Sequence, residues 1–287
     1  MVKWLESSIS SSTNKGGEGG ILVKLSRNSF KAIDNGDYDI RDSYHNYNNH
    51  ESKSLVKAIK DCIHAPLITE IKFASPSRGK ILPENDKKTI INIANTMLES
   101  GAIGISILTQ PYLFNGSIEN IISVRKNISI PILMKDIMVS KLQIDAAKKI
   151  GADYILLIKS IFDNNLAEDD LDNMIEYSHK KGLNIIYEVH TKEEMDEIIK
   201  INTSKKTDII GINNRNLDNL EIDLGTTELL LKNYDKQNNI VISESGISTV
   251  EQIRFLKRCG ADGFLIGTSI MESKNMKEKL MDLYLAL

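Results

Sequence analysis

The 287-residue sequence has few aromatic residues, few cysteines and no excess of positive charge. Aromatic residues make up 6% of the chain, too few for the stacking platforms that bind single-stranded nucleic acid. The formal net charge of -3 provides no basic patch for nucleic acid or for an anionic membrane. We therefore expect no nucleic-acid partner and no membrane partner.

Cysteine pairs and long apolar runs are also lacking. Cys62 and Cys259 have neither metal-ligand spacing nor a pairing pattern, so they indicate small thiols in a reducing compartment. No apolar run approaches the roughly 20 residues of a membrane span, and the N-terminus lacks the charged and then apolar pattern of a secretion signal. We expect a cytoplasmic protein with no metal ion.

The composition that is present fits a globular protein, with 41% hydrophobic and 26% charged residues. The N-terminal part, residues 1–65, is predicted to be an extension of the main domain. Residues 6–20 are rich in serine and glycine and indicate a mobile loop. Apolar periodicity predicts helices over residues 21–33 and 55–64, with a polar segment between them.

From Pro66 onward, apolar strand patterns alternate with helical patterns. Strands are predicted at 67–72, 103–108, 131–135, 153–158, 184–189, 208–213, 240–244 and 262–266. Helices are predicted at 84–100, 116–126, 140–150, 167–181, 192–202, 223–233, 249–259 and 274–286. Eight such units predict a single (β/α)8 TIM barrel over residues 66–287, with an open doubly wound sheet as the alternative.

A Gly-Ala pair recurs where a helix is predicted to end and a strand to begin. It occurs at Gly101-Ala102, Gly151-Ala152 and Gly260-Ala261, where glycine suits the left-handed position past a helix end. The last two copies continue into similar strands, which favours an internal repeat of the half-barrel kind. The alternative is that Gly-Ala is simply a common helix exit.

Ionisable and amide side chains follow the predicted strands at the point where each strand ends. They are Glu70, Lys72, Lys135, Glu188, Asn213, Arg215 and Glu244. Any one of them alone could be a solvated loop residue, but together they would meet at one end of a barrel, where barrel enzymes hold their catalytic groups. We expect burial to lower the pKa of Lys135 toward the range useful for acid catalysis.

The last two strands are followed by small residues that expose backbone N–H groups. Ser245-Gly246 follows the seventh strand and Gly267-Thr268-Ser269 the eighth, and a short extra helix is expected from Ser269. These are the loops in which barrel enzymes usually bind phosphate, so we expect a phosphorylated small-molecule ligand here.

These motifs, one per strand and in order, resemble the indole-3-glycerol phosphate synthase family from about Ala65 to Met271. The segments that carry the resemblance are Glu70-Ile71-Lys72-Phe73-Ala74-Ser75-Pro76-Ser77-Arg78-Gly79, Ser106-Ile107-Leu108-Thr109, Phe114-Asn115-Gly116-Ser117, Ile132-Leu133-Met134-Lys135-Asp136, Glu188-Val189-His190, Gly211-Ile212-Asn213-Asn214-Arg215-Asn216-Leu217, Ser243-Glu244-Ser245-Gly246-Ile247 and Leu265-Ile266-Gly267-Thr268-Ser269. The resemblance implies a carbon–carbon lyase of tryptophan biosynthesis that needs no cofactor. The family's substrate is 1-(2-carboxyphenylamino)-1-deoxyribulose 5-phosphate, which undergoes ring closure and then loses carbon dioxide and water.

The resemblance also assigns roles to residues. Lys135 would be the general acid of ring closure, held by nearby carboxylates so that it stays protonated. Lys72 and Glu188 would serve the dehydration, with Glu188 as the base; which lysine acts at which step stays open. Glu70, Asn213 and Glu244 would complete the catalytic set.

The remaining positions would bind the substrate. The substrate phosphate would be bound by Ser245, Gly246, Gly267 and Thr268, with Lys72 in reach. The anthranilate part would be contacted by Arg215, Ser75, Phe114 and Leu156. Leu156 could instead be a plain core residue. Ile137 stands where the family commonly has phenylalanine, so one aromatic wall is missing. His64, His179 and His190 match no catalytic position, and His190 is interpreted as a polar residue at a strand end.

Two alternative functions remain for a barrel of this kind. One is a phosphoribosylanthranilate isomerase, which needs a Cys/Asp acid–base pair at strand ends, and the other is a non-catalytic barrel that binds a phosphate ligand. The polar loop Ser75–Lys80 is expected to act as a lid, and the chain is expected to be a monomer or weak oligomer.

Overall fold

The computed structural model describes residues 20–40, 47, 50–75, 79–81, 86–201, 207–217 and 219–287. Residues 6–19 of the expected mobile loop and part of the polar segment after residue 40 lie outside this range. Among the described residues, no helix is long and apolar enough to cross a membrane.

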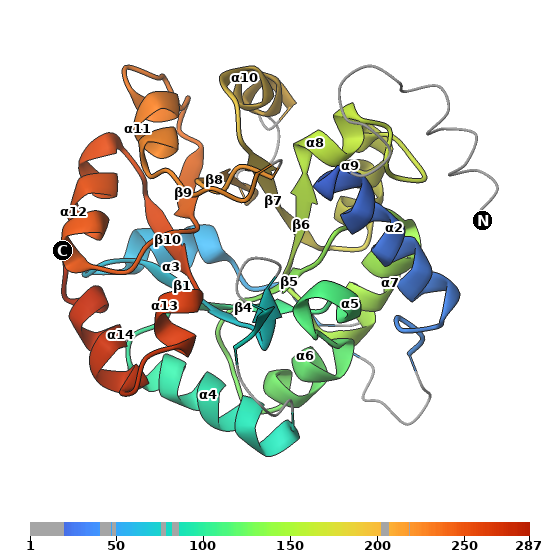
Figure 1. Ribbon diagram of the computed structural model, residues 1–287, viewed down its shortest axis with the longest axis horizontal. Coiled ribbons are helices and arrows are strands. Elements are labelled where there is room, and N and C mark those ends of the chain that lie inside the picture. Colours follow the sequence, from blue (N-terminus) through green and yellow to red (C-terminus); the bar gives the residue numbers. More distant parts are fainter. Residues whose placement is uncertain are drawn as a thin grey trace.

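Eight parallel strands form a closed barrel in the order β1-β10-β9-β8-β7-β6-β5-β4 (Figure 1). The strands are β1 (Leu67–Ile71), β4 (Gly104–Leu108), β5 (Ile132–Lys135), β6 (Tyr154–Ile158), β7 (Asn184–Val189), β8 (Ile209–Asn213), β9 (Ile240–Glu244) and β10 (Gly263–Ile266). Each of these ranges agrees with its predicted strand to within about one residue at either end. The barrel is confirmed, and the open sheet is excluded because β1 pairs with both β4 and β10.

Helices connect the strands and cover the outside of the barrel (Figure 1). They are α4 (Lys87–Glu99), α6 (Ile118–Arg125), α7 (Lys141–Ile150), α9 (Leu171–Lys180), α10 (Lys192–Ile201), α11 (Gly225–Leu231), α12 (Val250–Cys259) and α14 (Met276–Tyr284). Capping boxes begin α7 and α12, and left-handed Gly151 and Gly260 end them. The Gly-Ala pairs therefore mark helix ends, as expected.

Four short elements follow strands at the carboxyl end of the barrel. The hairpin of β2 (Ala74–Ser75) and β3 (Gly79–Lys80), helix α5 (Pro111–Phe114) and helix α8 (Lys159–Asp163) were not predicted, and α13 (Thr268–Met271) is the expected extra helix, beginning one residue earlier. The hairpin pairs Ser75 with Gly79. Residues 76–78 lie outside the described range, so the lid role of this loop stays a prediction.

The N-terminal extension contacts both ends of the barrel. Helix α2 (Ile21–Asp34) lies at the carboxyl end, where Ser26 donates a 2.6 Å hydrogen bond to the carbonyl of Leu166. Helix α3 (Leu55–Asp61), three residues shorter than predicted, lies at the opposite end, where the Leu55 N–H donates to the hydroxyl of Tyr154. The extension therefore packs against the barrel at both ends.

An aspartate precedes β6, β8 and β10, and each accepts a hydrogen bond from a backbone N–H of the strand before it. The pairs are Asp153 with Ile132, Asp208 with Ile185 and Asp262 with Val241. Asp153 and Asp262 follow a Gly-Ala pair, but Asp208 makes the same contact without one, so the internal repeat stays a prediction.

Candidate active site

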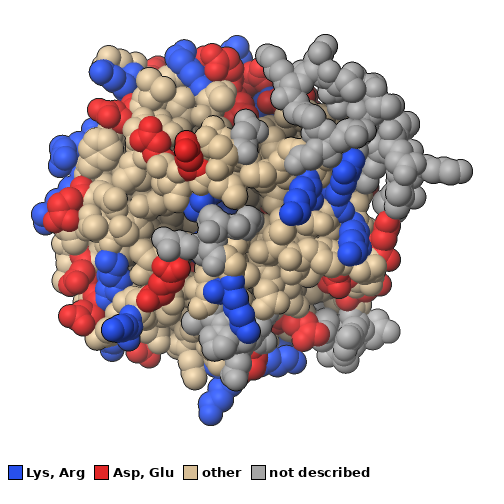
Figure 2. All heavy atoms as spheres, viewed as in Figure 1, with Lys and Arg blue, Asp and Glu red and all other residues tan. Residues whose placement is uncertain are grey.

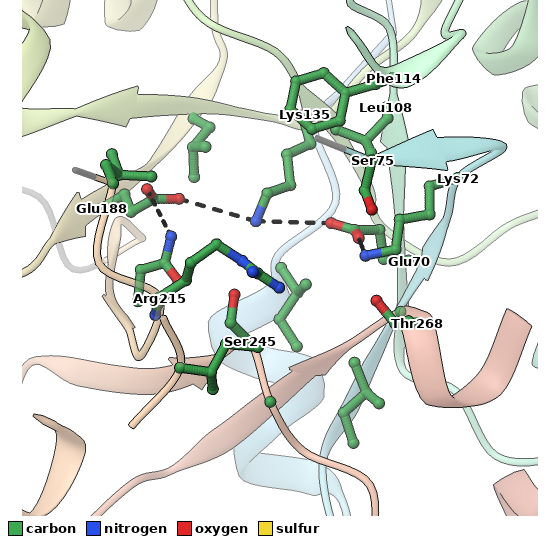
Figure 3. A pocket seen from close by; sticks show the side chains of 18 of the residues that line it. Glu70, Lys72, Ser75, Leu108, Phe114, Lys135, Glu188, Arg215, Ser245 and Thr268 are labelled. Atoms are coloured by element: carbon green, nitrogen blue, oxygen red, sulfur yellow. Dashed lines mark hydrogen bonds and ion pairs between the residues drawn. The ribbon is translucent and has the colours of Figure 1, made fainter. Parts of the chain in front are cut away.

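A cavity of about 380 Å³ opens at the carboxyl ends of the strands (Figures 2 and 3). On this face of the molecule, uncharged residues make up most of the described surface, and charged side chains are scattered among them (Figure 2). Every residue predicted for the site lines the cavity except Glu244, which is fully buried beneath it. The structure thus brings together side chains from all parts of the barrel sequence.

Lys135 lies at the centre of the polar groups, at the end of β5 (Figure 3). Its Nζ is 2.7 Å from Oε2 of Glu244, 3.7 Å from Oε2 of Glu70 and 3.9 Å from Oε2 of Glu188. A second ion pair joins Nζ of Lys72 to Oε1 of Glu70 at 2.8 Å. Two ammonium groups and three carboxylates therefore share one enclosed site.

The pKa of Lys135 is raised, so the lowering expected from burial alone was wrong. The protonated state that the family resemblance implied, with nearby carboxylates around the lysine, agrees with this direction. Burial does lower the pKa of this ammonium, but the carboxylates of Glu244, Glu70 and Glu188 raise it by more. The sequence pattern predicted burial, but it did not show that three carboxylates would lie within 4 Å. Lys135 is therefore held in its charged, proton-bearing form.

The pKa values of Glu70 and Glu244 shift in opposite directions. Burial raises the pKa of Glu70, but Lys72 and Lys135 outweigh it, and the pKa is lowered. For Glu244, burial raises the pKa and the pull of Lys135 only partly offsets it. Oε1 of Glu244 has no hydrogen-bond partner among the described residues. One site thus holds a firmly ionised carboxylate beside one that is costly to ionise.

Glu188 is held by an amide from the next strand. Nδ2 of Asn213 donates a 3.0 Å hydrogen bond to Oε1 of Glu188, and Oδ1 of Asn213 accepts the N–H of Arg215 at 3.0 Å. Asn213 therefore fixes the carboxylate on β7 and the start of the loop after β8 at once.

The loops after β9 and β10 form one corner of the cavity. Ser245 and Gly246 both have positive φ, +70° and +82°, a conformation that turns successive N–H groups toward a concave surface. The hydroxyl of Ser269 donates to the carbonyl of Ile247 at 2.8 Å and joins the two loops. This corner offers backbone N–H groups and hydroxyls, which suit an anion.

Apolar side chains line the opposite part of the cavity. Phe114 and Leu156 are there as predicted, together with Ile137 in place of an aromatic residue. Ile21 and Leu25 of α2 add a wall that the sequence did not predict, because nothing in it placed the extension over the barrel mouth. This surface suits an aromatic ring.

Arg215 and Ser75 also line the cavity (Figure 3). One Arg215 guanidinium nitrogen donates a 2.9 Å hydrogen bond to the carbonyl of Leu220. The Ser75 hydroxyl is buried without a hydrogen-bond partner among the described residues, so it is available to a ligand.

Asp136 belongs to one of the motifs of the family resemblance, but no role was predicted for it. It is buried and directly follows Lys135 in the chain. It accepts hydrogen bonds from the hydroxyls of Tyr38 (2.9 Å) and Thr109 and from the N–H of Ile137 (2.7 Å). Burial raises the pKa of Asp136 to about 7. A charged residue directly after an apolar strand was the signal for it, but its partner in the extension was not readable from sequence.

The closed barrel, with two lysines and three glutamates at the carboxyl ends of its strands, defines an acid–base enzyme of the TIM-barrel class. A family model described as indole-3-glycerol phosphate synthase matches residues 28–283. The chain belongs to the indole-3-glycerol phosphate synthase family.

Curated relatives agree with this assignment. The chain is 45% identical to the indole-3-glycerol phosphate synthase of Methanocaldococcus jannaschii over 230 residues, covering 79% of the chain and 82% of the relative. It is 37% identical to that of Bacillus mycoides over 256 residues, covering 88% and 96%. The activity is that of a carboxy-lyase of tryptophan biosynthesis with a phosphorylated substrate, which decides against the isomerase and the non-catalytic barrel.

Solved structures show the fold alone. An N-acetylmannosamine-6-phosphate 2-epimerase from Clostridium perfringens superposes with a TM-score of 0.56 at 16% identity, covering 77% of this chain and 92% of that one. A tryptophan synthase α-subunit from Pyrococcus furiosus superposes with a TM-score of 0.55 at 16% identity, covering 77% and 98%.

Proposed function

We propose that this cavity converts 1-(2-carboxyphenylamino)-1-deoxyribulose 5-phosphate into indole-3-glycerol phosphate, with the residue roles set out below. The observation that carries the proposal is the position of Lys135, a charged ammonium enclosed by three carboxylates beside an apolar wall. The reaction closes a ring, then releases carbon dioxide and then water.

Ring closure needs a proton donor at the ribulose carbonyl. As the aromatic carbon attacks, the carbonyl oxygen becomes an alkoxide, which is a stronger base than an amine. Lys135 transfers its proton to that oxygen, and the raised pKa of Lys135 ensures that the proton is present beforehand. Glu244 and Glu70 hold the ammonium in place.

Decarboxylation returns the electrons of the broken carbon–carbon bond to the ring. Arg215 is suited to bind the anthranilate carboxylate before it leaves, since a guanidinium binds a carboxylate through two parallel hydrogen bonds. Ser75 lines the same cavity, and its hydroxyl has no hydrogen-bond partner among the described residues. Phe114 and Leu156 hold the ring against the apolar wall.

Dehydration needs an acid for the departing hydroxyl and a base for the ring proton. Glu188 is the base, oriented by Asn213 at 3.0 Å. Either Lys72 or Lys135 supplies the acid, since both lie next to Glu70. The phosphate occupies the corner formed by Ser245, Gly246, Gly267 and Thr268. These four residues line the cavity, and the positive φ values of Ser245 and Gly246 suit the binding of an anion by backbone N–H groups.

Indole fluorescence tests the proposal directly. The parent protein is mixed with the carboxyphenylamino-deoxyribulose phosphate, and Lys135→Ala is compared with Lys141→Ala, whose ammonium pairs with Asp169 outside the cavity. Loss of a general acid costs about 100- to 10,000-fold in turnover, whereas Lys141→Ala should match the parent. Turnover that survives Lys135→Ala would reject the role of Lys135 while leaving the reaction in place.

A further inference from the structure

His190 directly follows β7 and lies beside the proposed base. Its Nε2 is 3.5 Å from Oε1 of Glu188, and its Nδ1 is 3.7 Å from Oε2 of Glu194. Both ring nitrogens are buried and make no hydrogen bond among the described residues. Among the described residues, these two carboxylates are therefore the ion-pair partners of the imidazole.

Glu194 is not free to move away from the ring. It lies in the first turn of α10, and its Oε2 accepts the backbone N–H groups of His190 at 2.6 Å and Thr191 at 3.3 Å. The side chain of Glu194 is only 11% exposed. The helix start therefore fixes one carboxylate on the far side of the imidazole from Glu188.

The charges around the ring favour its protonated form. Burial lowers the pKa of His190, but Glu194, Glu188 and, more distantly, Glu244 of β9 raise it by more, and the pKa is raised. Lys135 of β5 faces the same group from behind Glu188, 3.9 Å from its Oε2. Carboxylates thus outnumber cations around the imidazole.

We propose that His190 is a positioning residue that, as an imidazolium between Glu188 and Glu194, holds the Glu188 carboxylate in the correct orientation. This rests on the role of Glu188 as base in the proposed function. Oε1 of Glu188 then faces both Asn213 and His190, while Oε2 faces Lys135. An imidazolium 3.5 Å from the carboxylate attracts its negative charge and so helps to hold it in place.

The pairing is tested without turnover by NMR titration of the histidine ring protons. The chain has only five histidines, and His190→Asn assigns the signal. We expect the His190 pKa to lie above that of a free histidine and to fall by about one unit in both Glu188→Gln and Glu194→Gln. A His190 pKa that moves in neither variant would overturn the inference.

Kinetics test the consequence for Glu188. His190→Asn should lower kcat about 10-fold with little change in KM and move the acid limb of the kcat–pH profile to higher pH. In a Glu188→Gln background the same substitution should cost nothing further. Additive losses, or a Tm change with an unmoved acid limb, would show a merely structural role and overturn the inference.

His179→Asn is the matched control. His179 also pairs with a buried carboxylate, that of Asp208 at 2.8 Å, but at the opposite end of the barrel. It should lower Tm without moving the kcat–pH profile. If Glu188→Gln itself keeps full turnover, the base assignment of the proposed function is rejected; if Glu188→Gln is inactive and the His190 pKa stays unmoved, only the present inference is rejected.

Discussion

Gly211 on β8 and Glu244 on β9 are in contact, and the contact depends on the absence of a side chain. A Cβ added to Gly211 would lie 2.1 Å from Oε1 of Glu244. Gly267 gives room in the same way to Glu70, whose Oε1 would lie 2.6 Å from an added Cβ. Two glycines thus make space for the two carboxylates closest to Lys135.

Gly211→Ala should therefore disable the site more than the fold. The added methyl displaces the Glu244 carboxylate and disrupts its 2.7 Å pair with Lys135, so we expect kcat to fall at least about 10-fold, as for loss of a positioned catalytic group. Gly104→Ala is the control, because its Cβ would meet Cδ2 of Leu55, a residue of α3 at the opposite end of the barrel. Turnover and Tm are measured together; a fully active Gly211→Ala would contradict this account of the glycine.

Gly246→Ala should weaken phosphate binding. Gly246 has φ of +82°, and an added Cβ would lie 2.3 Å from Cγ2 of Ile222. We expect KM for the phosphorylated substrate to rise about 10-fold or more while kcat changes less. Gly260→Ala also has a positive φ but meets no close atom, so it should cost about 1 kcal/mol of stability and leave KM unchanged. Equal KM values for both variants would reject the phosphate corner.

Glu70→Gln should shift the basic limb of the pH profile. Glu70 is one of three carboxylates that raise the pKa of Lys135, so its neutralisation lowers that pKa. Lys135 then loses its proton at lower pH, and the basic limb of kcat should move downward. Glu99→Gln is the control, because Glu99 pairs with Lys277 on the outer surface. An unchanged basic limb with reduced kcat would assign Glu70 to orientation alone.

The strands were predictable because their apolar runs are bounded by helix patterns and Gly-Ala turns. Helices α5 and α8 were missed since four or five residues are too short to show a 3.6-residue period. The β2–β3 hairpin was missed because each strand has two residues and its pairing depends on a partner across the loop.

The sequence predicted which positions would contribute to the site, but it did not predict which of those residues would contact each other. Strand ends located Lys135 and Glu244, yet these residues are 109 positions apart, and only closure of the barrel brings them within 2.7 Å. The sign of the Lys135 pKa shift depends on that contact. Tyr38 reaches Asp136 from the extension, whose placement no local pattern specifies. His190 was interpreted as a strand-end polar residue, since neither Glu188 nor Glu194 could be placed beside its ring.

The buried Asp136 should make stability depend on pH. Its folded-state pKa of about 7 lies above the ordinary 3.8, so the folded protein retains a proton that the unfolded chain releases. Stability from this group is present below about pH 4 and is lost as pH rises to about 7. We therefore measure the free energy of unfolding in urea for Asp136→Asn and for the parent. Between pH 4 and 7, the value for Asp136→Asn should rise relative to that of the parent by a few kcal/mol.

The control for Asp136 has the opposite sign. A hydrogen bond from Lys141 lowers the pKa of Asp169, so its contribution is present above about pH 4 and is lost only at lower pH. The difference in the free energy of unfolding between Asp169→Asn and the parent should thus stay constant from pH 4 to 7. If the difference for Asp136→Asn is equally constant, Asp136 is ionised throughout that range. Its hydrogen bonds from Tyr38, Thr109 and Ile137 would then more than offset the cost of its burial.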